Sequence, residues 1–560
     1  MSVPRGRAVG DGFMKRSSIA VIGLFLLIYI ALLGVRPIMI PDESRYAEIP
    51  REMIAGDNWV VPCLNGLRYF EKPVLGYWLN AGSMILFGEN AFAVRFPSAV
   101  AAGVSALMVF FLVRRFAGGY SAGLVAAVIF LTCLLVFGVS TFNVLDGLFS
   151  LFITGIMVAF LFAHRAERPI RKMAFLVLSG IFCGLAFLTK GFIAFVGPLV
   201  AIVPFMVWER RWKDLFRFSW IPVLTALLIS LPWALMIHLR EPDFWDFFIW
   251  NEHIKRFMAD SAQHQEPFWY YLLWLPGAAL PWTPLFPAAV LGLKQSGLKS
   301  PLLRFSLCWF LFPFLFFSVS KGKLLTYILP CFPPLAILIG AGLHSYFKEG
   351  GRRLFRVGAT ILLPVMVTLA AALPVIQMTG FHDIKPYTQT WKWGLAIMAC
   401  LSWALFLLFS IRESRPQRKI MLYTAAPLLF MCIMPFVIPD LTAERKAPGE
   451  FLLRHSHRIY PNAILVSDED PVSAVCWFYR RNDIYLLGDP GELSYGLRYD
   501  ESKHRLMNFD QFSELVQKSQ RTAPVILFTK VKKYQDWKQH LPKPFFEDSN
   551  GNGGFIFAQF

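Results

Sequence analysis

Long apolar segments recur along most of this 560-residue chain, and they constrain its fold more than any other feature. Hydrophobic residues make up 56% of the chain and charged residues only 16%, whereas a soluble globular protein has about 25% charged residues. The mean hydropathy is +0.50. A run of about 20 apolar residues is long enough to cross the hydrocarbon core of a bilayer as a helix. The sequence therefore predicts a polytopic α-helical membrane protein.

Thirteen segments are candidates for crossing the membrane, although several are shorter than about 20 residues. They are residues 19–36, 92–113, 121–138, 143–163, 173–188, 192–208, 219–239, 269–293, 302–319, 325–346, 355–377, 391–411 and 420–438. The first follows a basic N-terminus without a convincing small-residue cleavage site, so we interpret it as an uncleaved helix rather than a signal peptide.

The charges of the connecting loops predict the orientation. Every second loop, starting from the N-terminal segment, carries Arg and Lys and almost no acidic residues, as at Arg114 and Arg115 or Arg168 and Lys172. Basic loops remain on the cytoplasmic side of a membrane. The N-terminus is therefore expected in the cytoplasm, and an odd number of crossings places the C-terminus outside. This topology also explains the net charge of +18 without a nucleic-acid partner.

Three hydrophilic regions fall on the outer side: the loops 37–91 and 240–268, and the C-terminal part from residue 441 onward. In the first loop, the apolar stretch 73–88 predicts a helix lying along or dipping into the membrane surface. The C-terminal part contains four short apolar runs, separated by polar helical stretches. These runs are 463–468, 484–489, 524–530 and 554–560. The sequence therefore predicts a transmembrane domain over 1–440 and a soluble α/β domain over 441–560.

Charged residues gather at the start of the first outer loop. Asp42, Glu43, Arg45 and Tyr46 follow directly after the first apolar segment. A helix that begins at this point would explain the two acidic residues, since carboxylates favour a helix N-terminus. It would not explain Arg45.

A second polar group lies just before the predicted surface helix. It contains Tyr69, Glu71 and Lys72. Anchoring of the chain at the membrane surface by Tyr and Lys is the simpler interpretation of this group. Its position at the same level as the first group favours a shared site.

Further charges occur at the outer ends of other predicted membrane helices. Asp146 lies near the outer end of the segment 143–163, where a carboxylate is costly and indicates function or a structural ion pair. Lys190, Lys321 and Lys323 occupy outer turns, with Tyr327 close by. Outer turns are usually poor in Lys. As an alternative to a functional role, these lysines could extend along apolar surface so that their ammonium groups reach the membrane boundary. Lys and Arg at one membrane surface suit a phosphorylated lipid.

The second outer loop adds Arg256, His253 and His264. A His from this loop and Glu71 could together hold a divalent cation such as zinc or magnesium. Two ligands are weak support for a metal, and a His of this kind more often forms a hydrogen bond.

Several strings in these loops resemble the lipid A 4-amino-4-deoxy-L-arabinose transferases. The matching strings run in order from residue 41 to 497: PDESRYAEIPREM (41–53), LRYFEKPVLGYW (67–78), LTKGF (188–192), FWDFFIWNEHIKRF (244–257), AQHQEPFWYY (262–271), FFSVSKGKLLTYIL (316–329) and GELSYGL (491–497). The Pro-Asp-Glu opening is shared with a wider clan that includes protein O-mannosyltransferases. One departure is Leu325, where the family pattern has Pro.

The resemblance implies a fold of the GT-C type and an inverting membrane glycosyltransferase. Its expected donor is undecaprenyl phosphate-linked aminoarabinose and its expected acceptor is a lipid A phosphate, on the periplasmic side of the inner membrane. The family modifies lipopolysaccharide, which implies resistance to polymyxin and other cationic peptides. No cofactor is expected to be essential.

The chemistry of such a transfer assigns expected roles to the candidate residues. Attack at an anomeric carbon passes through an oxocarbenium-like state. We expect Asp42, Asp146 and Glu43 to be catalytic. We expect the donor phosphate to contact Arg45, Lys72, Lys190, Lys321, Lys323 and Tyr327, and other parts of the substrates to contact Tyr46, Tyr69, Arg256 and His264. Glu71 and His253 are the tentative metal ligands. A phosphate acceptor needs no base, so Asp42 would orient a substrate; with a hydroxyl acceptor, Asp42 would be the general base.

Other functions remain open. A sibling enzyme could transfer another sugar to protein or glycan. A transporter of lipid-linked sugar would be expected to carry charges in mid-membrane and inverted repeats, which the sequence does not display. A scaffold protein would not need carboxylates and cations clustered at one depth.

Overall fold

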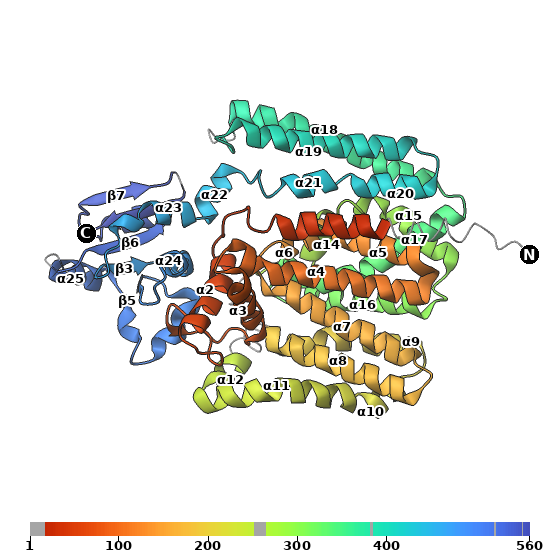
Figure 1. Cartoon of the computed structure of the whole chain (residues 1–560), viewed down its shortest axis with the longest axis horizontal. Helices are drawn as coiled ribbons and strands as arrows, with labels where there is room; N and C mark the ends of the chain where they lie inside the picture. Colours follow the sequence, from red (N-terminus) through yellow and green to blue (C-terminus); the bar gives the residue numbers. More distant parts are fainter. Residues whose placement is uncertain (1–16, 251–264, 381–384, 520–521, 552) are drawn as a thin grey trace, which may run out of the picture.

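The computed structural model describes the chain from residue 17 to 560, apart from residues 251–264, 381–384, 520–521 and 552. A bundle of helices forms most of the molecule, and a smaller sheet domain lies at one end of it (Figure 1). The main helices of the bundle are Ser17–Ala31, α4 (Ala91–Val113), α5 (Gly119–Thr132), α6 (Leu134–Ser140), α7 (Leu145–Arg165), α8 (Pro169–Lys190), α9 (Ile193–Trp208), α10 (Lys213–Phe218), α11 (Trp220–Arg240), α14 (Tyr270–Ala278), α15 (Phe286–Ser296), α16 (Pro301–Val319), α17 (Phe332–Lys348), α18 (Arg353–Thr379), α19 (Thr390–Arg412), α20 (Pro416–Ala425) and α21 (Leu428–Ile433).

Many of the predicted membrane segments are single long helices. Among the described residues, eight helices are long and apolar enough to cross a membrane by themselves. The predicted segments 19–36 and 192–208 correspond to shorter apolar helices, Ser17–Ala31 and Ile193–Trp208. The chain is therefore a multi-pass membrane protein. The structure does not fix the number of crossings at thirteen, because the remaining segments are interrupted.

Three predicted segments are interrupted in the middle. The segment 121–138 bends by 67° between α5 and α6. At the bend, the Leu134 N–H finds a partner outside its own helix, because it donates to the Leu280 carbonyl over 2.9 Å. The segments 269–293 and 420–438 each divide into two helices, at Pro281 and Pro427. Proline lacks the backbone N–H that a continuous helix requires, which explains these breaks.

The first outer loop folds into two helices joined by a short hairpin. Helix α2 (Asp42–Ala55) begins at the polar group, and α3 (Leu75–Phe87) coincides with the predicted surface helix. Strands β1 (Cys63–Leu64) and β2 (Leu67–Arg68) pair between them. In the second outer loop a short helix, α12 (Phe244–Asp246), follows α11.

The C-terminal part forms a six-stranded mixed sheet with the strand order β5-β4-β3-β6-β8-β7. The four predicted strands are present as β3 (Ile464–Ser467), β4 (Tyr485–Leu487), β6 (Val525–Lys530) and β8 (Phe555–Gln559). Two more, β5 (Leu506–Met507) and β7 (Phe546–Ser549), are shorter or partly exposed and lack a clear apolar run. The associated helices are α22 (Asp440–Lys446), α23 (Gly449–Arg454), α24 (Val472–Tyr479), α25 (Phe509–Ser519) and α26 (Val531–Trp537).

Buried hydrogen bonds attach this sheet domain to the first outer loop. The side-chain amide of Asn65 donates to the Ile484 carbonyl over 2.8 Å, and its oxygen accepts from the Ile484 N–H over 2.9 Å. The hydroxyls of Ser44 on α2 and Ser473 on α24 are 2.7 Å apart. Figure 1 shows the sheet domain beside α2 and α3. The domain therefore covers the loop that carries the candidate catalytic residues.

Candidate active site

Asp42 is the first residue of α2, which confirms that the acidic pair marks a helix N-terminus. The side chain of Asp42 is 45% exposed, so it can be reached by a substrate. Its carboxylate pairs with the guanidinium of Arg45, which lies one turn further along the helix. The helix start therefore places a carboxylate and a guanidinium side by side at the surface of the bundle.

Glu43 points the other way, into the protein. Its carboxylate is fully buried between two guanidinium groups, those of Arg36 and Arg95. Arg95 donates to both carboxylate oxygens, over 2.7 and 2.8 Å, and the backbone N–H groups of Met39 and Asn143 complete the shell. Burial opposes ionisation, but the two arginines together lower the pKa of Glu43. Glu43 is therefore an ionised, enclosed carboxylate that links several segments, whereas the sequence suggested a catalytic group that a substrate reaches.

This buried cluster fixes the outer ends of several elements relative to one another. Arg95 belongs to α4 and also donates to the carbonyls of Leu33, Arg36 and Pro37. Asn143 lies three residues before Asp146, at the start of α7. The contacts of Glu43 thereby fix the position of its neighbour Asp42 and of the segment 143–146, which leads into α7.

Arg45 lies at the centre of a group that extends into the sheet domain. Its guanidinium donates to the Tyr69 hydroxyl over 3.1 Å and pairs with the carboxylate of Glu492. The Tyr69 hydroxyl in turn donates to Glu492 over 2.9 Å. Glu492 lies just after β4, within the string GELSYGL. The sequence had marked this string as similar to the family, but it did not assign Glu492 to the site.

A second ion pair joins two membrane helices at the same level. Lys190, the last residue of α8, donates to the Asp146 carboxylate at the first turn of α7 over 2.7 Å. The Lys190 ammonium lies 5.2 Å from the centre of the Tyr327 ring. Both charges are mostly buried, at 13% exposure each. The structural ion pair that the sequence left open for Asp146 is therefore present, and it places Lys190 and Tyr327 together.

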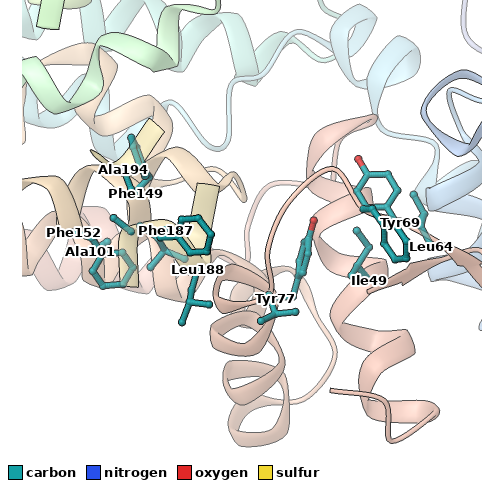
Figure 2. Close-up of a cluster of buried hydrophobic side chains, with 14 of the residues drawn as sticks. Ile49, Leu64, Tyr69, Tyr77, Ala101, Phe149, Phe152, Phe187, Leu188 and Ala194 are labelled. Atoms are coloured by element: carbon teal, nitrogen blue, oxygen red, sulfur yellow. The ribbon is translucent and has the colours of Figure 1, made fainter. Parts of the chain in front are cut away.

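Aromatic side chains of α7 and α8 pack together in the buried core near these charges. Phe149 and Phe152 of α7 belong to one buried cluster with Phe187 of α8 (Figure 2). Tyr69 and Ile49 belong to the same cluster on the loop side (Figure 2). The charged groups of α2, α7 and α8 are therefore connected through one buried apolar cluster.

The hydroxyl of Tyr46 interacts electrostatically with the Asp42–Arg45 pair and with Asp146. Burial raises its pKa; Arg45 acts in the opposite direction, and the carboxylates of Asp42, Glu71 and Asp146 raise it further. Tyr46 therefore remains a protonated hydrogen-bond donor. The structure brings together Asp42, Arg45, Tyr46, Tyr69, Glu71, Asp146, Lys190 and Tyr327 in this way.

Lys72 and Glu71 lie between α2 and α3 and are partly buried. The Lys72 ammonium donates to the Glu71 carbonyl over 2.8 Å and is 3.8 Å from the Glu71 carboxylate. Within the described residues no group of three His, Cys, Asp or Glu side chains could hold a metal ion. The other tentative ligand, His253, lies outside those residues, as do Arg256 and His264.

The two lysines of the outer turn after α16 differ from each other. Lys321 is exposed, whereas Lys323 is only 3% exposed. The Lys323 ammonium donates to the backbone carbonyls of Glu266 and Ser320, and burial lowers its pKa. Lys323 therefore ties the turn to the second outer loop. This differs from the expected contact with a phosphate.

Two further groups of this surface were missed by sequence reasoning. Arg95 is one, although a charge inside the predicted segment 92–113 was the available signal. The other is the contact of Asp243 with the hydroxyls of Tyr495 and Tyr499, which lie in the sheet domain. Such a pairing has no local sequence signal because its partners are about 250 residues apart.

Comparison with known proteins identifies the family. Residues 16–248 match the model of dolichyl-phosphate-mannose-protein mannosyltransferases, and residues 443–557 match that of the arabinosyl transferase ArnT C-terminal domain. Similar proteins are undecaprenyl phosphate-alpha-4-amino-4-deoxy-L-arabinose arabinosyl transferases. The one from Shewanella sediminis is 42% identical over 93% of this chain and 94% of its own. The one from Aeromonas salmonicida is 39% identical over 93% and 95%.

A solved structure supports the same assignment at the level of the fold. The crystal structure of ArnT from Cupriavidus metallidurans bound to undecaprenyl phosphate covers 97% of both chains, with a TM-score of 0.83 and 21% identity. The apo structure of that protein has a TM-score of 0.80. On the identity and coverage of its relatives, this chain is a membrane glycosyltransferase that belongs to the undecaprenyl phosphate-alpha-4-amino-4-deoxy-L-arabinose arabinosyl transferase family.

Proposed function

We propose that this protein transfers 4-amino-4-deoxy-L-arabinose from undecaprenyl phosphate to a phosphate group of lipid A, at the periplasmic face of the inner membrane. The observation that carries the proposal is the match, over more than nine-tenths of the chain, to relatives named for this donor. The exposed carboxylate of Asp42 beside Arg45, at the surface of the bundle, supports it.

The transfer is a single displacement. An oxygen of the acceptor phosphate attacks the anomeric carbon and forms a new C–O bond. The bond between that carbon and the donor phosphate breaks, and undecaprenyl phosphate leaves with the electron pair. The leaving phosphate gains charge, so cations that contact it lower the barrier.

The cations of the site divide into two roles in this proposal. Lys72, Lys190 and Lys321 provide positive charge for the donor phosphate, with Tyr327 as a hydroxyl donor. Arg45 binds a phosphate only if it exchanges one of its carboxylate partners, Asp42 or Glu492, for the substrate. Asp42, released in this way, would orient the acceptor or pair with the ammonium group of the sugar.

The mass of lipid A tests the proposed function. Cells that carry the protein should produce lipid A with an added pentosamine, and cells without it should not. The Asp42→Ala variant, produced at equal level, should give a smaller share of modified lipid A. A different sugar increment would support the sibling enzyme instead. Unmodified lipid A together with a newly glycosylated protein or glycan would refute the proposal.

The orientation can be tested with reporter fusions. An enzyme that is active only outside the cytoplasm should be active when fused after Phe560 and silent when fused near Arg168, because basic loops remain inside. A cytoplasm-specific reporter at the same two positions should give the opposite pattern. If both reporters reversed this pattern, the candidate site would face the cytoplasm and could not act on periplasmic lipid A.

Lys72→Ala should lower turnover about a hundredfold, the usual effect of removing one group that stabilises charge in a transition state. Its thermal stability should change little, because the ion pair of Lys72 with its sequence neighbour Glu71 links no distant segments of the chain, and a pair of this kind contributes little to folding. Initial rates in detergent, with the donor lipid and purified lipid A, provide the measurement. Lys503→Ala is the matched control, since Lys503 is an exposed lysine of the sheet domain that pairs with Asp500. Normal turnover of Lys72→Ala would remove Lys72 from the site.

A further inference from the structure

A large apolar cavity lies beside the Glu43 cluster, since Arg36 and Met39, which both bind Glu43, are among its lining residues. Its volume is about 520 Å³. It is lined by the outer end of the first helix, by α6 and by the group of helices α18, α19 and α21. Figure 1 shows α21 between the first helix and the pair formed by α18 and α19. Representative lining residues are Leu33, Leu369, Ala399, Cys400, Ile433 and Met434.

The cavity opens toward the lipid-facing surface of the bundle. Two of its lining residues, Leu369 of α18 and Met434 just after α21, are 49% and 38% exposed. Ala399 and Cys400 lie deeper and are almost fully buried. Tyr387, between α18 and α19, and Thr442 of α22 line the same cavity. The cavity therefore extends from the lipid-facing surface of the bundle inward, along α18 and α19.

The chemistry of the lining selects an apolar ligand. Most of the lining is apolar, so the cavity offers ordered water few hydrogen-bond partners. Its exposed lining residue Leu369 belongs to α18, one of the helices long and apolar enough to cross a membrane. Arg36 is the one charged residue of the lining, and its guanidinium is already occupied by Glu43 and by the Thr141 carbonyl. No headgroup phosphate is therefore recognised inside the cavity.

The donor lipid is a poor candidate for this space. The lysines proposed to hold its phosphate, among them Lys72 and Lys190, do not line the cavity, and neither do α7, α8 or η5 (Leu325–Cys331). We propose that the cavity binds an acyl chain of a membrane phospholipid, by shape and apolar contact and with little selection for the headgroup.

The bound acyl chain stabilises the candidate active site through residues that line the cavity. Arg36, Met39, Thr141 and Phe142 form the inner wall of the cavity. Two of them bind Glu43 directly: Arg36 through its guanidinium and Met39 through its backbone N–H. An acyl chain that fills the cavity restricts these residues, and through them the start of α2, where Asp42 lies. The lipid is thus a positioning ligand and takes no part in the transfer.

Photolabelling of the full-length protein tests the proposal. The protein is placed in bilayer discs made of phosphatidylethanolamine and phosphatidylglycerol, with a small fraction of a phospholipid that carries a diazirine midway along one acyl chain. After irradiation, adducts are mapped by mass spectrometry. We expect adducts on buried lining residues such as Cys400 and Ile433, as well as on the exposed lipid-facing residues. Labelling of Cys400 no stronger than that of Phe205, a buried residue outside the cavity, would overturn the proposal.

Variants of α19 distinguish the cavity from the outer surface of the bundle. Ala399→Trp fills the cavity and should abolish the adducts on Cys400 and Ile433, with adducts on exposed residues unchanged. Leu401→Trp, on the exposed face of the same helix, should leave both sets unchanged. Ala396→Leu is a milder substitution of a lining residue if Ala399→Trp does not fold. A photoreactive undecaprenyl phosphate or lipid A that labels Cys400 and displaces the phospholipid adduct would also overturn the proposal, whatever the outcome of the lipid A assay.

Discussion

Arg95→Met is expected to lower the free energy of unfolding by about 3–5 kcal/mol, the usual cost of breaking a buried ion pair by removal of one partner. The methionine has a similar length but no charge and no donor. Glu43 would remain buried with only Arg36 to balance it. The carbonyls of Leu33, Arg36 and Pro37 would also lose a donor. The midpoint of thermal unfolding in detergent provides the measurement.

The matched control for this variant is Arg114→Met. Arg114 is the residue directly after the C-terminal end of α4, the helix that carries Arg95. Its side chain is exposed. Its replacement should leave the unfolding midpoint nearly unchanged. Turnover of Arg95→Met should fall together with the folded fraction. A fully stable Arg95→Met protein that has lost turnover would restore Glu43 and its partners to the catalytic group, against the assignment made above.

Asp42→Asn is expected to lower turnover while retaining the acidic limb of the pH-rate profile. An acceptor phosphate has a second pKa of about 6 and is its own nucleophile above that pH. The amide keeps the shape of the carboxylate but loses the ion pair with Arg45. The variant should therefore lose orientation of the substrate and keep the limb, at reduced height. Initial rates on lipid A between about pH 5 and 8 provide the profile, since this range spans the acceptor ionisation.

The same profile reveals the alternative mechanism. If Asp42 removes a proton from a hydroxyl acceptor, its replacement should cost about 10²–10⁴ in rate, and the limb should disappear from the variant. That outcome would contradict the orienting role. Asp57→Asn is the control, because Asp57 is an exposed carboxylate just beyond the end of the same helix. It should reproduce the wild-type profile in height and shape.

Much of the architecture can be predicted from the sequence, because it depends on local pattern. The apolar segments predict most membrane helices, since a bilayer requires about 20 apolar residues whatever their neighbours are. The predicted strands 463–468 and 524–530 are present because a buried strand is apolar throughout. Strands β5 and β7 were not predicted. They lie at the two edges of the sheet, where fewer side chains are buried and the apolar signal is weak.

Residues of the candidate site were also indicated by local chemistry. Asp42, Arg45, Asp146 and Lys190 stand out because charges at the outer ends of apolar segments are costly. Their chemical type suggested a phosphate-handling site. The resemblance of the surrounding strings suggested the family, and the comparisons confirmed it.

Only the tertiary structure decided which charges face the substrate and which hold the protein together. Asp42 and Glu43 are neighbours with the same chemistry, yet one is exposed and the other is enclosed by Arg36 and Arg95. Arg95 is 52 residues away from Glu43, and Glu492 is 423 residues away from Tyr69. The sequence determined that carboxylates and cations gather at one surface of a membrane bundle. Their pairing was decided by packing, because the energy of an ion pair depends on distance and burial, and both are set by contacts between segments that the chain brings together only when it folds.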